Sequence, residues 1–216
     1  MRITFFFILF LLLSCKSSFV FREGDLLFQL SDCGSFCDAI NKVTDGYNGI
    51  DFNHVGILGK DEAGNWEVLE AVTKGVVKTP LQTFLDRSLD VDGKPLVAVG
   101  RLRENYRYLI PMALTAGEKY IGKGYDQVFD LENDQYYCSE LVYFTYLDSA
   151  GKPLFELNPM TFNDPGTGEL FNIWEEYYAE LGEEIPEGMP GLNPGGISTS
   201  KKLEIYFPFS GFGKNK

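Results

Sequence analysis

Histidine is almost absent from this sequence, which contains a single one, His54, among 216 residues. Imidazole is the side chain whose ordinary pKa lies near neutrality, so an imidazole base working at neutral pH must be His54. No His-x-x-x-His or Cys-x-x-Cys pattern is present, and zinc hydrolases depend on ligands at such spacings. We therefore expect neither a metal ion nor an organic cofactor. The alternative for His54 is a structural strand histidine bonded to the backbone.

Basic residues are scarce as well. Lysine and arginine total 19 against 31 aspartates and glutamates, which gives a net charge of −12. Nucleic-acid binding is excluded, because phosphate neutralisation needs clustered Lys and Arg. A cationic substrate is compatible with this charge, although acidity also serves solubility. The sequence contains no Gly-rich phosphate loop and no Gly-x-Ser-x-Gly motif, so nothing marks a nucleotide site or a serine nucleophile.

Cysteine occurs four times, as Cys15, Cys33, Cys37 and Cys138. If Cys15 carries a lipid, three thiols remain, and at least one of them has no partner within the chain. Cys33 and Cys37 are four residues apart, a spacing that one helical turn brings together but that suits a disulfide poorly. We expect both to be small buried residues, with a disulfide formed in an oxidising compartment as the alternative.

The first 14 residues have the composition of a signal peptide. Arg2 precedes an apolar run, residues 5–13, that is too short to span a membrane comfortably. The run ends in LLSC, residues 12–15, which resembles the lipobox of bacterial lipoproteins. We expect export across the inner membrane and a lipid anchor on Cys15, at the periplasmic or cell-surface face; a buried N-terminal strand or helix is the alternative. Removal of residues 1–14 changes the net charge from −12 to −13.

The remaining chain is long enough to bury one core, and its 44% apolar content is typical of a globular domain. We predict a tether over residues 15–23 and a single domain over 24–216. From residue 155 onward Pro, Gly and Asn recur, and we expect 155–216 to be an irregular C-terminal extension.

Apolar periodicity predicts an α+β fold, with a small antiparallel sheet packed by helices. Strands are predicted over residues 24–30, 52–59, 66–72, 75–79 and 95–102, and helices over 31–44, 80–85, 107–120, 136–149 and 174–181. Ser31 or Asp32 is the natural N-cap of the first helix.

Glu70 is a carboxylate on an otherwise apolar strand face. If residues 60–64 form the hairpin loop, Leu58 opposes Trp66 and His54 opposes Glu70. A carboxylate on such a face needs a partner, and His54 would be that partner. The pair would fix the imidazole tautomer, as the third member of a catalytic triad does. A register slip or an exposed edge glutamate is the alternative.

Cys138 falls in the first turn of the helix predicted over 136–149. Unpaired backbone N–H groups and the helix dipole favour a thiolate there. With a histidine nearby, this setting makes a thiol nucleophilic, and the same N–H groups can stabilise an oxyanion. The alternative is an inert packed cysteine.

In this order the motifs resemble one known family. They are GDLLF at 24–28, FNHVGI at 52–57, VLEA at 68–71, YD at 125–126 and YCSELV at 137–142. Together, over residues 22–150, they resemble the YiiX/YaeF-like enzymes, a circularly permuted branch of the NlpC-type papain-like cysteine hydrolases. In unpermuted relatives the cysteine helix precedes the histidine hairpin.

The resemblance implies that Cys138 is the nucleophile, His54 the base and Glu70 the residue that orients the base. Tyr125 and Asp25 are expected to line or brace the site. Amide bonds, often in cell-wall peptides, are the implied substrate. Two alternatives stay open: hydrolysis or transfer of lipid acyl groups, as in relatives similar to lecithin:retinol acyltransferase, and a surface binding module that has lost turnover.

Overall fold

The computed structural model describes residues 19–32, 34–209 and 211–213. The predicted signal peptide, lipobox and Cys15 lie outside these residues. In the described part of the chain no helix combines the length and apolar character that crossing a membrane requires.

An antiparallel sheet of six strands forms the centre of the fold, in the order β4-β3-β2-β1-β5-β8. The strands are β1 (Leu26–Gln29), β2 (His54–Lys60), β3 (Trp66–Val72), β4 (Gly75–Pro80), β5 (Val97–Leu102) and β8 (Leu203–Tyr206). The predicted α+β class is therefore confirmed. The first five strands match the five that periodicity predicted.

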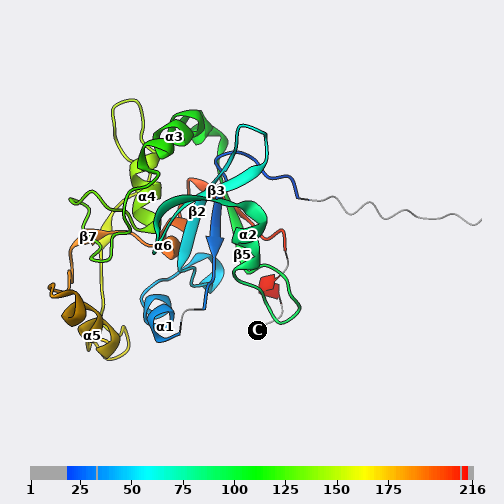
Figure 1. Cartoon of the computed structure of the whole chain (residues 1–216). Helices are drawn as coiled ribbons and strands as arrows, with labels where there is room; N and C mark the ends of the chain where they lie inside the picture. Colours follow the sequence, from blue (N-terminus) through cyan, green and yellow to red (C-terminus); the bar gives the residue numbers. More distant parts are fainter. Residues whose placement is uncertain (1–18, 33, 210, 214–216) are drawn as a thin grey trace, which may run out of the picture.

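Helices cover both faces of this sheet (Figure 1). They are α1 (Ser35–Lys42), α2 (Leu81–Asp86), α3 (Ile110–Gly117), α4 (Cys138–Thr145), α5 (Asn172–Leu181) and α6 (Pro194–Ser198). One face buries Val55 and Ile57 of β2 against Leu141 and Val142 of α4. The opposite face buries Leu58 and neighbours against α2. Since side chains alternate along a strand, consecutive residues of β2 serve different layers.

Three predicted helices are shorter than expected, and the one predicted over 136–149 is α4, Cys138–Thr145. The first begins at Ser35, with Gly34 at the N-cap in place of Ser31 or Asp32. Gly34 has φ +69°, and its N–H donates to the Asp32 carboxylate at 3.0 Å. The segment predicted as one helix over 107–120 divides into α3 between 3₁₀ turns at Glu104–Leu109 and Glu118–Tyr120.

Cys37 is buried and disulfide-bonded, so the expectation of a small buried thiol is wrong for this residue. Cys33, the partner considered from spacing, lies outside the described residues. Cys138 is the free cysteine of the described chain.

The segment 155–216 is less irregular than composition suggested. A two-stranded ribbon, β6 (Asn158–Pro159) with β7 (Pro190–Gly191), and helices α5 and α6 precede β8, which pairs with β5 at the sheet edge. Helix α5 packs Trp174 and Tyr178 against α1, where Phe36 and Ala39 complete a third apolar cluster. The extension is thus tied to the rest of the fold through α5 and through β8.

Candidate active site

Cys138 is the first residue of α4, and its side chain is 7% exposed. The preceding Tyr137 is extended, with φ −90° and ψ 170°, so the helix begins abruptly at the thiol. Glu140 Oε2 accepts the Tyr137 N–H at 3.1 Å and stabilises this start. The first N–H groups of a helix have no partner within it, and they surround the sulfur with positive partial charge.

His54 is the first residue of strand β2, and its imidazole contacts the thiol of Cys138 at the start of helix α4. Its Nε2 atom lies 2.6 Å from Oε2 of Glu70. The Cys138 thiol forms the other polar contact of the ring. Because Nε2 is taken by Glu70, Nδ1 is the nitrogen that faces the thiol. The ring centroid of Phe84 lies 5.9 Å from that of the imidazole.

Glu70 is fully buried, and each of its oxygens has two partners. Oε2 interacts with His54 and accepts from Arg87 Nη1 at 2.8 Å, whereas Oε1 accepts from Arg87 Nη2 at 2.7 Å and Thr79 Oγ1 at 2.6 Å. The bidentate guanidinium compensates the buried charge and fixes the plane of the carboxylate. Thr79 and Arg87 are therefore site residues that sequence reasoning missed.

The sequence held a weak signal for Thr79 and none for Arg87. Thr79 stands on the same face of the sheet as Glu70, where β4 pairs with β3. Arg87 directly follows α2, and only the packing of that helix on the sheet shows that its side chain reaches the buried carboxylate.

The charges of the three groups reinforce one another. Burial lowers the pKa of His54, but contacts with Cys138 and Glu70 outweigh burial and raise it to about 9. Burial raises the pKa of the Cys138 thiol, but His54 outweighs this effect and the net pKa is lowered. Burial likewise opposes ionisation of Glu70, whereas Arg87, His54 and Thr79 lower its pKa to about 2. The arrangement therefore favours a thiolate–imidazolium pair beside a permanent carboxylate.

The hairpin register differs from the prediction. Lys60 pairs with Trp66 and Leu58 with Val68, because the loop comprises residues 61–65. The Asp61 carboxylate holds this loop by accepting from the backbone N–H of Asn65 at 2.8 Å. A shift of two positions keeps every side chain on its predicted face, so His54 and Glu70 meet diagonally.

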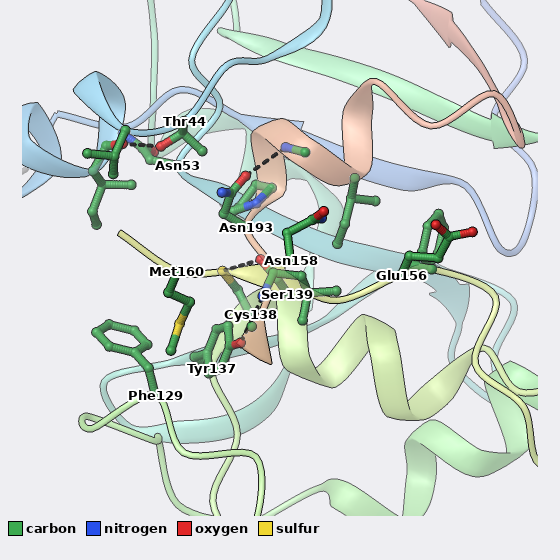
Figure 2. A pocket seen from close by; sticks show the side chains of 18 of the residues that line it. Thr44, Asn53, Phe129, Tyr137, Cys138, Ser139, Glu156, Asn158, Met160 and Asn193 are labelled. Carbon is green, nitrogen blue, oxygen red and sulfur yellow. Dashed lines mark hydrogen bonds between the residues drawn. The ribbon is translucent and has the colours of Figure 1, made fainter. Parts of the chain in front are cut away.

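Cys138 lines a cavity of about 550 Å³, shown in Figure 2. Residues of the C-terminal segment form much of its wall, including Asn158, Met160 and Asn193. His54 is not among the residues that line the cavity, so a substrate in the cavity meets the thiol of Cys138 first.

The structure places the two remaining predicted site residues, Tyr125 and Asp25, differently. Tyr125 lines the cavity, and burial together with the charge of Cys138 raises its pKa. Asp25 is not at the site: it is buried at the far end of β1 from His54 and pairs with Arg101, whose Nη2 lies 2.7 Å from Oδ2. The expectation that Asp25 lines or braces the site is wrong, because both of its oxygens are occupied by Arg101 and the Arg22 backbone.

Comparisons with known proteins identify the family to which the chain is similar. Residues 20–205 match the model of a family described as permuted papain-like amidase enzyme, YaeF/YiiX, C92 family. The uncharacterized protein YiiX of Escherichia coli strain K12 is 29% identical over 183 residues, 84% of each chain. A crystal structure described as metalloprotein yiiX from Escherichia coli O157:H7 has a TM-score of 0.68 at 26% identity, and the match covers 86% of this chain and 96% of that one.

The description of that neighbour names a metalloprotein. Within residues 19–32, 34–209 and 211–213 of this chain, no three His, Cys, Asp or Glu side chains are grouped so as to hold a metal ion. No metal step is part of the mechanism proposed below.

Proposed function

Because this chain belongs to the YaeF/YiiX family of permuted papain-like amidases, we propose that it hydrolyses amide bonds through Cys138, His54 and Glu70. One observation carries the proposal: the free thiol at the start of α4 contacts the imidazole of His54, which is bonded to a buried carboxylate. This combination of nucleophile, base and orienting group defines a nucleophilic acyl-transfer site.

The reaction has two halves. The Cys138 thiolate attacks the amide carbonyl, and the N–H groups at the start of α4 stabilise the resulting oxyanion. The His54 imidazolium then donates its proton to the leaving amine as the C–N bond breaks, which leaves a thioester on Cys138. Neutral His54 next takes a proton from water, the hydroxyl adds to the thioester carbonyl, and the C–S bond breaks to release the acid.

Glu70 serves as a positioning residue in this mechanism. Its bond to Nε2 turns Nδ1 toward Cys138 and stabilises the imidazolium. Thr79 and Arg87 hold the carboxylate in place, so the imidazole orientation depends on three elements of the fold.

Cell-wall peptides are the substrate class that we propose first, since residues 1–15 predict export and a lipid anchor on Cys15. Such an anchor would place the protein at the periplasmic or cell-surface face of a bacterial membrane. Replacement of Cys15 by Ala should release the protein from the membrane fraction. Release of the wild-type protein by salt alone would contradict a lipid anchor.

Alkylation of Cys138 tests the catalytic pair. Iodoacetamide should label the wild-type thiol at pH 6 at least about tenfold faster than an ordinary thiol, and His54→Ala should remove this advantage. Peptide mapping identifies Cys138 as the labelled residue. An unchanged rate in His54→Ala would overturn the proposed pair.

Turnover tests the activity itself. The protein should cleave amides of cell-wall peptides, and Cys138→Ala should abolish cleavage while leaving the melting temperature close to that of the wild type. Short-chain lipid esters serve as the second substrate set. Labelling without turnover of either set would favour a binding module over an enzyme.

A further inference from the structure

The cavity beside Cys138 is bounded mainly by apolar side chains. Aromatic rings contribute from several separate segments, and Met160 adds an adaptable thioether. The rings belong to Tyr106, Tyr125, Phe129, Tyr137, Phe155, Phe162 and Trp174. A volume of about 550 Å³ lies within the range of pockets that bind drug-sized ligands.

Charge is scarce in this wall, although the chain has a net charge of −12. The charged side chains are Glu156, Lys201 and Lys202. Two of them neutralise each other, since Lys202 Nζ lies 3.6 Å from Glu156 Oε1. The acidic side chains of the protein therefore do not gather around the cavity, and its wall offers no cluster of carboxylates to a cationic ligand.

Part of the polar wall is already hydrogen-bonded within the protein. Asn53 exchanges two hydrogen bonds with the backbone of Ser31, at 2.8 Å and 2.7 Å. Asn193 caps α6 by accepting the Gly196 N–H at 2.7 Å. These amides brace the walls, so they offer little to a ligand.

Phe129 is held in the cavity wall by an unusual backbone. Its φ is +57°, in the left-handed region that non-glycine residues rarely adopt. The fully buried Asp126 maintains this turn, because its carboxylate accepts from the backbone N–H groups of Val128 at 3.0 Å and Asp130 at 2.7 Å, and from Asn133 Nδ2 at 3.0 Å. Strain of this kind persists where the surroundings enforce it, and it concentrates at functional sites.

The enforced position places the Phe129 ring between the nucleophile helix and the C-terminal segment. The ring packs edge-to-face on Tyr137 at 5.2 Å and on Trp174 of α5 at 6.3 Å. Figure 2 shows Phe129, Met160 and Tyr137 gathered on the same side of Cys138, whereas Glu156 lies toward the other end of the view.

We infer that this cavity receives an apolar substituent of the substrate amide and that Phe129 is a specificity-determining residue for it. The inference rests on the proposed function and narrows it: amides that carry an aliphatic or aromatic acyl group are favoured over the acidic and sugar parts of cell-wall material. Apolar side chains lining the cavity gain free energy when such a group displaces water.

The test uses reaction with Cys138 and needs no turnover. 2-Chloroacetamide and 2-chlorodecanamide, which carries an octyl chain on the acyl carbon that the thiolate attacks, are compared by their labelling rates, each normalised to the rate with free cysteine. In the wild-type protein the octyl reagent should be favoured by at least about tenfold. Phe129→Ala should remove most of this preference. Phe36→Ala, which deletes a ring from the same aromatic cluster outside the cavity, should retain it.

Phe129→Gly guards against misfolding of the alanine variant, because glycine adopts positive φ freely. Phe129→Gly should lose the preference for the octyl reagent, as Phe129→Ala does, and its melting temperature should be no lower than that of Phe129→Ala. Equal normalised rates for the two reagents in the wild type would overturn the inference, as would an octyl preference that survives both Phe129 variants.

The proposed function can fail separately. A preference for the octyl reagent without cleavage of any amide would contradict the proposed catalysis but would support an apolar binding cavity. Conversely, amide cleavage that shows no acyl-chain preference would sink only the inference about the cavity. If Cys138 resists both reagents, melting-temperature shifts of Cys138→Ser with octanamide and acetamide decide the matter, and equal shifts would overturn the inference.

Discussion

Nε2 of His54 lies 2.6 Å from Oε2 of Glu70, although the two residues are not opposite each other in the sheet. They meet diagonally across Gly56, whose missing side chain leaves the Glu70 Cβ close to the β2 backbone. The Nε2–Oε2 contact therefore depends on a glycine between the two functional residues as well as on the residues themselves.

Replacement of Glu70 should shift the basic limb of the pH–activity profile to lower pH. In the wild type the imidazolium is lost as pH rises through about 9. Glu70→Gln removes the carboxylate charge that raises this pKa, so the limb should fall by roughly one to two units. Rates of amide cleavage or Cys138 alkylation against pH measure the limb. Glu67→Gln, on the same strand but bonded to Lys78, is the control and should leave it in place.

Glu140 should be exchangeable for glutamine. Burial raises the pKa of this carboxyl to about 9, so the folded protein holds its proton at neutral pH. An acid with a raised pKa contributes stability below its unfolded pKa, and this stability is lost as pH rises toward 9. Glu140→Gln should therefore be more stable than the wild type, by up to about 3 kcal/mol at pH 7, and similar to it near pH 4. Urea unfolding at both pH values measures the difference.

The capping contact provides a control for that result. The amide oxygen of the Glu140→Gln variant can still accept the Tyr137 N–H, whereas Glu140→Ala has no acceptor and should be destabilised at every pH. A glutamine variant that is less stable than the wild type at pH 7 would contradict a protonated Glu140.

Gly56 should not tolerate a side chain. A Cβ at this position would lie 2.4 Å from Val68 Cγ1, so Gly56→Ala must push β2 and β3 apart. We expect a loss of about 1–3 kcal/mol in stability and a lower alkylation rate of Cys138, because the His54–Glu70 contact spans this point. Gly59→Ala on the same strand meets Leu114 at an ordinary 3.5 Å and is the matched control. Equal behaviour of the two variants would refute the steric argument.

Asp25 should prove structural. Asp25→Asn breaks a buried ion pair with Arg101 and should lower the free energy of unfolding by about 3 kcal/mol. The rate of Cys138 alkylation at pH 6 should not change, since Asp25 is remote from the site. Glu204→Gln, which breaks the exposed pair with Arg103, should leave the free energy of unfolding nearly unchanged. Slower alkylation of Cys138 in Asp25→Asn would show that Asp25 does support the site.

Local sequence patterns were sufficient for the α+β class and for the first five strands of the sheet. They failed where an element depends on distant partners. The strand Leu203–Tyr206 lies in a Pro- and Gly-rich segment, and only its pairing with β5, about 100 residues earlier in the chain, makes it part of the sheet. The register of the β2–β3 hairpin was missed for a local reason: the Asp61 carboxylate accepts the Asn65 N–H and stabilises a loop one position later than predicted.

For the site, the sequence determined the chemical inventory: one imidazole, one thiol at a helix start and one carboxylate on an apolar strand. Scarcity made this possible, because with a single histidine there was one candidate base. The tertiary structure alone decided which groups surround them. Arg87 reaches Glu70 only because α2 packs on the sheet, and the cavity exists only because residues 155–202 fold back over α4. Such contacts join residues far apart in the chain, and their free energy comes from packing that no local pattern encodes.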